Sequence, residues 1–183
     1  MGFFTIELAR RVGPDGRVVA VDVQERMLRA LERRMKRRGL GDRVQTRPTD
    51  GRNLPIADLR AAVDLCTAIH VVHEVPDTAR FFEQVREALK PHGTVMVVEP
   101  AGHVDEAEFE EQVRAAEAVG LAVVEGLPTV GATRQERVGF GRFHLFHLDL
   151  DSAEAEVISA LDAIDTTPSA TTPGKITGYW HFM

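Results

Sequence analysis

Residues 2–28 read GFFTIELARRVGPDGRVVAVDVQERML, and this stretch decides the fold class. The spacing of apolar residues over 4–12 predicts a helix that packs on a sheet. Gly-Pro-Asp-Gly at 13–16 predicts a turn, because glycine and proline end helices. The nearly all-apolar run 17–22 predicts a buried parallel strand that closes on an acid, and 24–38 predicts an amphipathic helix. Helix, strand and helix in this order indicate an α/β protein.

The same alternation continues along the chain. Further strands are predicted at 43–47, 63–69, 94–99 and 143–150, and further helices at 78–89, 106–119 and 152–164. Strands alternating with helices predict a doubly wound, mostly parallel sheet with helices on both faces. In such a sheet a ligand binds beyond the carboxyl ends of the strands, near the point where the strand order reverses.

The length of 183 residues suits a single core. We predict one α/β domain over 1–150, followed over 151–183 by a C-terminal helix and a mobile tail. Residues 165–178 are rich in Thr, Pro, Ser and Gly, a composition that favours disorder. The sequence Tyr-Trp-His-Phe at 179–182 follows this segment.

Composition excludes several function classes. The formal charge of -6 disfavours a nucleic-acid partner, and the basic cluster over 26–38 is interpreted as a solvated helix face. Cys66 is the only cysteine, so an intrachain disulfide and a multi-cysteine metal site are excluded. No apolar run is long enough to span a membrane, and no signal-peptide pattern is present. We therefore expect a cytoplasmic protein without a membrane partner, and the oligomeric state stays open.

Two acids follow successive predicted strands. Asp22 ends the strand 17–22, where a carboxylate can accept both hydroxyls of a ribose. The alternative is that Asp22 only caps the helix that follows. Asp50, in Thr-Asp-Gly, can accept the amine of an adenine while Gly51 lets the backbone pass close to the ring. The alternative there is an Asp-Gly turn without a ligand.

The segment after the strand 63–69 carries the candidates for acid and base chemistry. His70, His73 and Glu74 are predicted to lie on the substrate side, and histidine titrates near neutral pH. The alternative is that one histidine packs in the core and the other is solvated. A metal site would combine His70 and His73 with Glu74 and His103, but we predict no metal. Glu99 is a further polar position at the same edge, with a structural or a functional role.

Taken in order, these segments resemble class I methyltransferases with a Rossmann-like fold. The resemblance covers about residues 2–125 and is carried by residues 2–28 together with PTDGRNLP at 48–55, DLCTAIHVVHEVPD at 64–77 and LKPHGTVMVVEP at 89–100. It implies the methyltransferase fold and S-adenosylmethionine as the cofactor. It also implies donor-binding residues, namely Gly2, Asp22, Val23, Met27, Asp50, Gly51 and Thr67.

The sequence departs from the family pattern ahead of Gly2, which matches the last glycine of the family's Gly-x-Gly-x-Gly turn. The strand and the earlier glycines that precede this position in the family are absent here. We therefore predict a fold that lacks its first strand, truncated within the first motif. A buried central strand contributes roughly 10 kcal/mol, so weak folding or weak donor binding is expected.

The function predicted from this resemblance is S-adenosylmethionine-dependent methyl transfer to a small-molecule acceptor, with His70, His73 and Glu74 as catalytic candidates. The alternative is a truncated or degenerate domain without activity that binds a protein partner. A short-chain dehydrogenase is disfavoured, because it needs a Tyr-x-x-x-Lys pair. The only tyrosine is Tyr179, and the residue four positions later is Met183 instead of lysine.

Overall fold

The computed structural model describes residues 2–100, 103–123, 142–148 and 176–180. Its helices are α1 (Phe3–Arg11), α2 (Glu25–Arg37), α3 (Thr78–Ala88) and α4 (Glu106–Ala118). Its strands are β1 (Arg17–Asp22), β2 (Val44–Pro48), β3 (Val63–Ile69), β4 (Leu89–Pro100), β5 (Ala122–Val123), β6 (Arg142–Leu148) and β7 (Ile176–Trp180). Short 3-10 helices are η1 (Gly41–Arg43), η2 (Ala57–Leu59) and η3 (Val72–Glu74).

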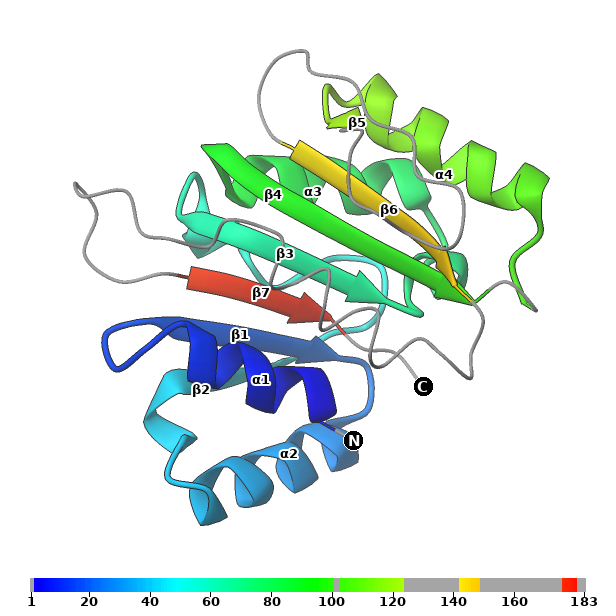
Figure 1. Cartoon of the computed structure of the whole chain (residues 1–183). Helices are drawn as coiled ribbons and strands as arrows, with labels where there is room; N and C mark the ends of the chain where they lie inside the picture. Colours follow the sequence, from blue (N-terminus) through cyan, green and yellow to red (C-terminus); the bar gives the residue numbers. More distant parts are fainter. Residues whose placement is uncertain (1, 101–102, 124–141, 149–175, 181–183) are drawn as a thin grey trace.

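The strands form one seven-stranded sheet in the order β2-β1-β7-β3-β4-β6-β5. Every neighbouring pair is parallel. The arrows of β1, β7, β3, β4 and β6 in Figure 1 therefore point in the same direction. The predicted doubly wound, parallel α/β architecture is confirmed.

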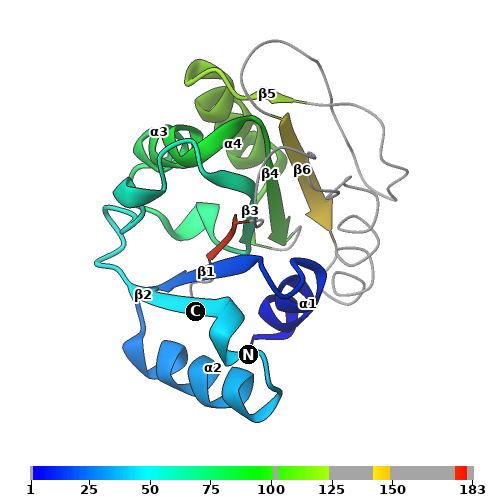
Figure 2. The same cartoon turned by 90° about the vertical axis from the view of Figure 1, so that its left-hand side faces the viewer.

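Two helical layers cover the sheet because its strands bury both of their faces. On one face, Ile6 and Leu8 of α1 and Leu31 of α2 pack against alternate strand residues such as Val18. On the other face, α3 and α4 pack against the intervening positions, with Phe82 at the centre of that cluster. Figure 2 shows the two helical pairs on opposite sides of the sheet.

Local signals account for where the helices begin and end. The Asp77 side chain accepts the N–H of Arg80 at 2.9 Å and so caps α3. Asp105 and Glu108 form a reciprocal capping box at the start of α4. Behind α2, Gly39 has a φ of 68°, which glycine adopts without strain. No described helix combines the length and the apolar character needed to cross a membrane.

The central position of the sheet is held by β7. Gly178 pairs with Val19 of β1 on one side and with Cys66 of β3 on the other. The sequence places residues up to 178 in a mobile tail, whereas the structure places Ile176–Trp180 between two buried strands. The reason is tertiary: β1 and β3 each present an open row of backbone donors and acceptors, and a third strand satisfies both rows.

Other predictions fare differently. The predicted break at residues 90–93 lies inside β4, where the pairing with β3 is irregular between Val63 and Leu65. The predicted helix 152–164 falls outside the described residues, as does the boundary at residue 150. Since β7 shares the sheet with β1 and β3, part of the segment 151–183 belongs to the main sheet.

Candidate active site

The topology predicts a ligand site at the carboxyl ends of β1, β7 and β3. From β1 the chain runs through α2 to β2 on one side, and from β3 it runs through α3 to β4 on the other. The strand order therefore reverses around β7. Ligands of open parallel sheets bind at such a point, because the loops diverge there and leave room between them.

Asp22 lies at this point, with 4% of its surface exposed. Its Oδ1 accepts the backbone N–H of Gln24 at 2.7 Å, and Gln24 is the N-cap residue of α2. Its carbonyl oxygen accepts the N–H of Thr49 at 3.1 Å, which holds the loop after β2 against the end of β1. Both predictions for Asp22 are thus compatible: one carboxylate oxygen supports the helix start, and the residue lies at the carboxyl edge of the sheet.

Asp50 and Gly51 lie in that loop after β2. Asp50 Oδ1 accepts the N–H groups of Arg52 at 2.9 Å and Asn53 at 3.2 Å, and these bonds lower the pKa of the exposed Asp50 carboxyl. This is the local turn that the sequence offered as the alternative. Gly51 has a φ of 81°, and a Cβ built there would lie 3.4 Å from Cγ1 of Val23.

Among the described residues, Val23 is the one large apolar residue that is exposed, at 38%. Because Val23 and Gly51 lie next to each other, the structure brings together the loop predicted to bind the ribose and the loop predicted to bind the adenine. Met27, in the first turn of α2, is instead 6% exposed and packs inward.

Gly2 begins α1 in a left-handed conformation, with a φ of 68°. A Cβ built on Gly2 would lie 2.5 Å from Cδ1 of Leu31, so a larger residue here would have to displace the end of that side chain as well as adopt a positive φ. The carbonyl oxygen of Gly2 accepts the N–H of Ile6 at 3.1 Å. A positive φ is typical of a glycine in a turn, the place that the resemblance gives to Gly2, while its contact with a donor stays a prediction.

Thr67 is fully buried in β3, and its Oγ1 has no hydrogen-bond partner among the described residues. Side chains alternate along a strand, so Thr67 shares the α1 face of the sheet with Leu65 and Ile69. Thr5 of α1 has a second buried hydroxyl without a partner in the same described set. A buried hydroxyl without a partner is costly, and both oxygens are closed to solvent in this structure.

The segment after β3 places the three catalytic candidates differently. His70 has a φ of 55°, and its backbone N–H donates to the carbonyl oxygen of Val98 at 2.7 Å. His73, in η3, hydrogen-bonds through Nδ1 to Oε2 of Glu99. Glu74 Oε1 lies 4.0 Å from His73 Nε2. The structure therefore brings together His73, Glu74 and Glu99.

Glu99 is a functional candidate whose pairing with His73 could not be predicted from the sequence. Its side chain is completely buried at the end of β4, and Oε1 accepts the N–H of Val72 at 2.8 Å. Burial raises the pKa of the Glu99 carboxyl, and the adjacent His73 partly opposes that effect. The available signal was an acid that closes the apolar run TVMVVE, the same pattern that identified Asp22. Among the described residues no three His, Cys, Asp or Glu side chains are arranged to hold a metal ion.

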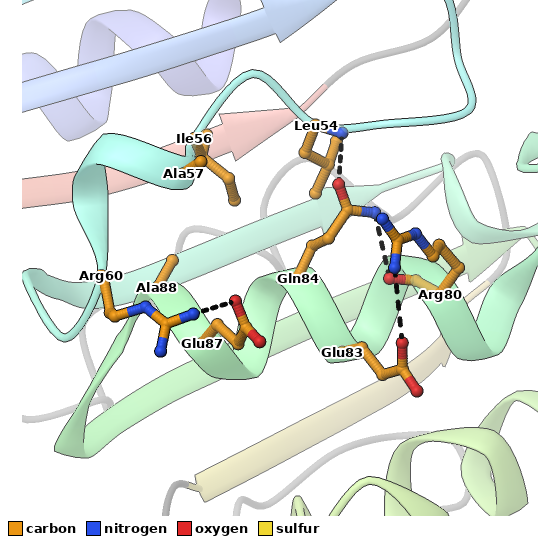
Figure 3. Close-up of a pocket in the computed structure, with 9 residues that line it drawn as sticks. All are labelled: Leu54, Ile56, Ala57, Arg60, Arg80, Glu83, Gln84, Glu87 and Ala88. Atoms are coloured by element: carbon orange, nitrogen blue, oxygen red, sulfur yellow. Dashed lines mark hydrogen bonds and ion pairs between the residues drawn. The ribbon is translucent and has the colours of Figure 1, made fainter.

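One pocket lies elsewhere, between the loop after β2 and α3. It encloses about 270 Å³ and is lined by Leu54, Ile56 and Arg60 on one side and by Arg80 and Gln84 on the other, among others. Figure 3 shows that its polar side chains are largely engaged with each other and with the chain: Gln84 accepts the Leu54 N–H at 2.8 Å. None of the predicted donor-binding residues lines this pocket.

Comparison with known proteins identifies the architecture. A crystal structure of a SAM-dependent methyltransferase from Aquifex aeolicus superposes with a TM-score of 0.58 at 23% identity, covering 68% of this chain and 69% of that chain. At this identity the likeness concerns the fold. It confirms a Rossmann-like methyltransferase fold.

Curated relatives match about half of the chain. A demethylmenaquinone methyltransferase of Lactobacillus johnsonii is 31% identical over 98 residues, which are 54% of this chain and 39% of that protein. One of Geobacillus kaustophilus is 32% identical over 96 residues, or 52% and 40%. The ubiquinone/menaquinone biosynthesis C-methyltransferase UbiE of Idiomarina loihiensis is 30% identical over 98 residues, or 54% and 38%. The matched part thus spans about two fifths of each relative's length.

The match to a family model covers residues 1–93, half of the 183-residue chain, and the family is described as a methyltransferase domain. This range contains β1, β2 and β3 with Asp22, Asp50 and the segment from His70 to Glu74. Membership implies S-adenosylmethionine as the cofactor. On this match and on its fold, the chain belongs to the methyltransferase domain family.

Proposed function

We propose that this chain binds S-adenosylmethionine at the carboxyl edge of β1, β2 and β3 and takes part in methyl transfer to a small-molecule acceptor. The observation that carries the proposal is the placement of Asp22, buried at the end of β1 and bonded through its carbonyl oxygen to the loop of Asp50 and Gly51. The two loops predicted to flank adenosine therefore meet at one place.

The residues at this edge suit the chemistry of the donor. A carboxylate at the end of β1 can accept ribose hydroxyls, and the exposed Val23 beside Gly51 offers an apolar surface to an adenine ring. The hydroxyl of Thr67, which has no partner among the described residues, can donate to or accept from the amino-acid end. When bound, S-adenosylmethionine supplies a methyl group on a positively charged sulfur. In the proposal Gly2, Asp22, Val23, Met27, Asp50, Gly51 and Thr67 hold it.

For the acceptor we propose an aromatic hydroquinone. The relatives named above support this class, since their names refer to demethylmenaquinone and to ubiquinone and menaquinone biosynthesis. Such an acceptor becomes a stronger nucleophile when a hydroxyl loses its proton, so a base is required. His70, His73 and Glu74 are the candidates for that role.

Titration calorimetry with S-adenosylhomocysteine tests the proposal directly. We expect saturable heats at micromolar to millimolar ligand, and a higher unfolding temperature in the presence of the ligand. Flat heats at millimolar ligand would instead support the alternative of a degenerate domain that binds a protein partner.

A further inference from the structure

We propose that Glu99 is a positioning residue that fixes the His73 ring with Nε2 as its proton-accepting nitrogen, which makes His73 the base among the three candidates. The geometric part of this inference stands on the contacts of Glu99 and His73. The catalytic part rests on the proposed methyl transfer.

The Glu99 carboxylate hydrogen-bonds to two consecutive residues of η3. Its Oε1 accepts the backbone N–H of Val72 at 2.8 Å, and its Oε2 contacts Nδ1 of His73. Because one carboxylate binds both the backbone and the ring, the ring can neither slide nor rotate without breaking a contact. The Glu99 side chain is completely buried, so losing either partner would leave a buried oxygen without a hydrogen bond.

This contact decides which nitrogen of His73 carries the proton. A carboxylate accepts hydrogen bonds, so Nδ1 of His73 must donate its N–H to Glu99. In the neutral ring the proton is then on Nδ1, and Nε2 is left as the acceptor. The Oε1 atom of Glu74 lies 4.0 Å from Nε2, which is too long for a hydrogen bond.

The His73 side chain is also accessible. It is 24% exposed, whereas Glu99 behind it is 0% exposed. His73 follows β3, and Glu99 lies near the end of the neighbouring strand β4. Both residues therefore lie at the carboxyl edge of the sheet, where the ligand site is predicted. A fully buried acid and a partly exposed imidazole are thus arranged in sequence from the core to the surface.

This arrangement suits an acceptor that must lose a proton from a hydroxyl group. The O–H bond of the acceptor breaks, its electron pair stays on oxygen, and the proton forms a bond to Nε2. The imidazolium that results is stabilised by the Glu99 carboxylate at Nδ1. The acidic neighbours Glu74 and Glu99 disfavour an anionic acceptor, so the class we infer is a neutral hydroxylated molecule.

Nuclear magnetic resonance of the ring nitrogens tests the geometry in the ligand-free protein. In protein labelled with ¹⁵N-histidine at about pH 8.5, where imidazole is neutral, we expect His73, assigned by its loss in His73→Gln, to show a protonated Nδ1 and an unprotonated Nε2. In Glu99→Gln the single amide oxygen is expected to accept from Val72, so the amide NH₂ faces Nδ1 and the ring changes to the Nε2–H tautomer. A wild-type Nε2–H tautomer, or the same tautomer in both proteins, would overturn the inference.

Kinetics with S-adenosylmethionine and 1,4-naphthohydroquinone as the probe acceptor test the role. We expect His73→Gln to lower kcat by about 100-fold or more, and Glu99→Gln to lower it by about 10- to 100-fold with KM changed less than about threefold. Glu99→Asp should recover part of the loss, because it restores a carboxylate. Glu87→Gln, which alters an exposed acid on α3, should match the wild type.

The outcomes separate the two proposals. If wild type transfers methyl groups and both Glu99→Gln and His73→Gln retain its kcat, the inference about His73 is wrong while the proposed function stands. If wild type neither binds S-adenosylhomocysteine nor transfers a methyl group, the proposed function is wrong, and the tautomer measurement still tests the role of Glu99. Unfolding temperatures of all variants identify any that fail to fold.

Discussion

The backbone N–H of Thr49 donates to the carbonyl oxygen of Asp22 at 3.1 Å, which ties the loop after β2 to the end of β1. These two residues are far apart in sequence, yet the bond places Gly51 beside Val23. The proposed donor site depends on this arrangement, because neither loop alone offers both an acid and an apolar surface.

Asp22→Asn should weaken binding of S-adenosylhomocysteine. The amide keeps an oxygen for the Gln24 N–H but removes the charge that a ribose would meet. Charge-assisted hydrogen bonds contribute about 1.5–3 kcal/mol, so we expect affinity to fall by about 10- to 100-fold in titration calorimetry. The control is Asp42→Asn, which removes the charge of an exposed acid in η1. Equal affinities for wild type and Asp22→Asn would refute a role for Asp22 in donor binding.

Gly51→Ala should impair both stability and binding, whereas Gly39→Ala should impair stability only. Both glycines have positive φ, 81° and 68°, where a Cβ costs about 1–2 kcal/mol. A Cβ at Gly39 meets nothing within 4 Å, whereas one at Gly51 enters the space beside Val23. Thermal unfolding of both variants measures the backbone strain, and calorimetry measures whether the added Cβ obstructs ligand binding. If the two variants bind S-adenosylhomocysteine equally, the adenine is not placed beside Gly51.

Glu99→Gln should change how stability depends on pH. Burial raises the pKa of Glu99 above its ordinary value of 4.5, so the folded state holds this proton more tightly than the unfolded state does. The stability gained in this way is complete below pH 4.5 and is lost as the pH rises through the raised pKa of the folded state.

Glutamine does not titrate, so the unfolding free energy of Glu99→Gln relative to wild type should increase as the pH rises from 4.5 through the raised pKa of Glu99. Urea denaturation at intervals across this range measures it, with Glu87→Gln as the exposed counterpart. A relative stability that is constant or falls with pH would contradict the direction of the shift.

Thr177→Pro should destabilise the fold far more than Thr177→Val. Thr177 pairs with Val18 of β1 and with Leu65 of β3, so it lies inside the sheet. Proline removes the backbone N–H and costs about 3 kcal/mol or more in a central strand, which corresponds to a decrease of about 6–12 °C in Tm for this size. Valine keeps the N–H and the β-branched shape. Equal melting curves for the two variants would show that this segment does not occupy the centre of the sheet.

The fold class could be predicted because its signals are local. The alternation of buried strands and amphipathic helices is encoded in the spacing of apolar residues, as in 17–22 and 24–38, and each element largely forms where its own pattern predicts. Asp22 was identified for the same reason: an acid at the end of an apolar strand is visible without knowledge of its neighbours. The turn at Asp50 is likewise a local hydrogen-bond pattern.

The position of β7 and the pairing of His73 with Glu99 could not be predicted in this way. The strand Ile176–Trp180 is stabilised by the backbone edges of β1 and β3, which are remote in sequence, and its own short pattern resembles that of a tail. His73 meets Glu99 only through the register of β3 against β4. Periodicity and turn chemistry act over a few residues, so the sequence by itself determined the helices α1 to α4, the strands β1 to β4 and their order. Contacts between remote segments depend on which edges and faces remain unpaired after those elements form, and only the tertiary structure decides them.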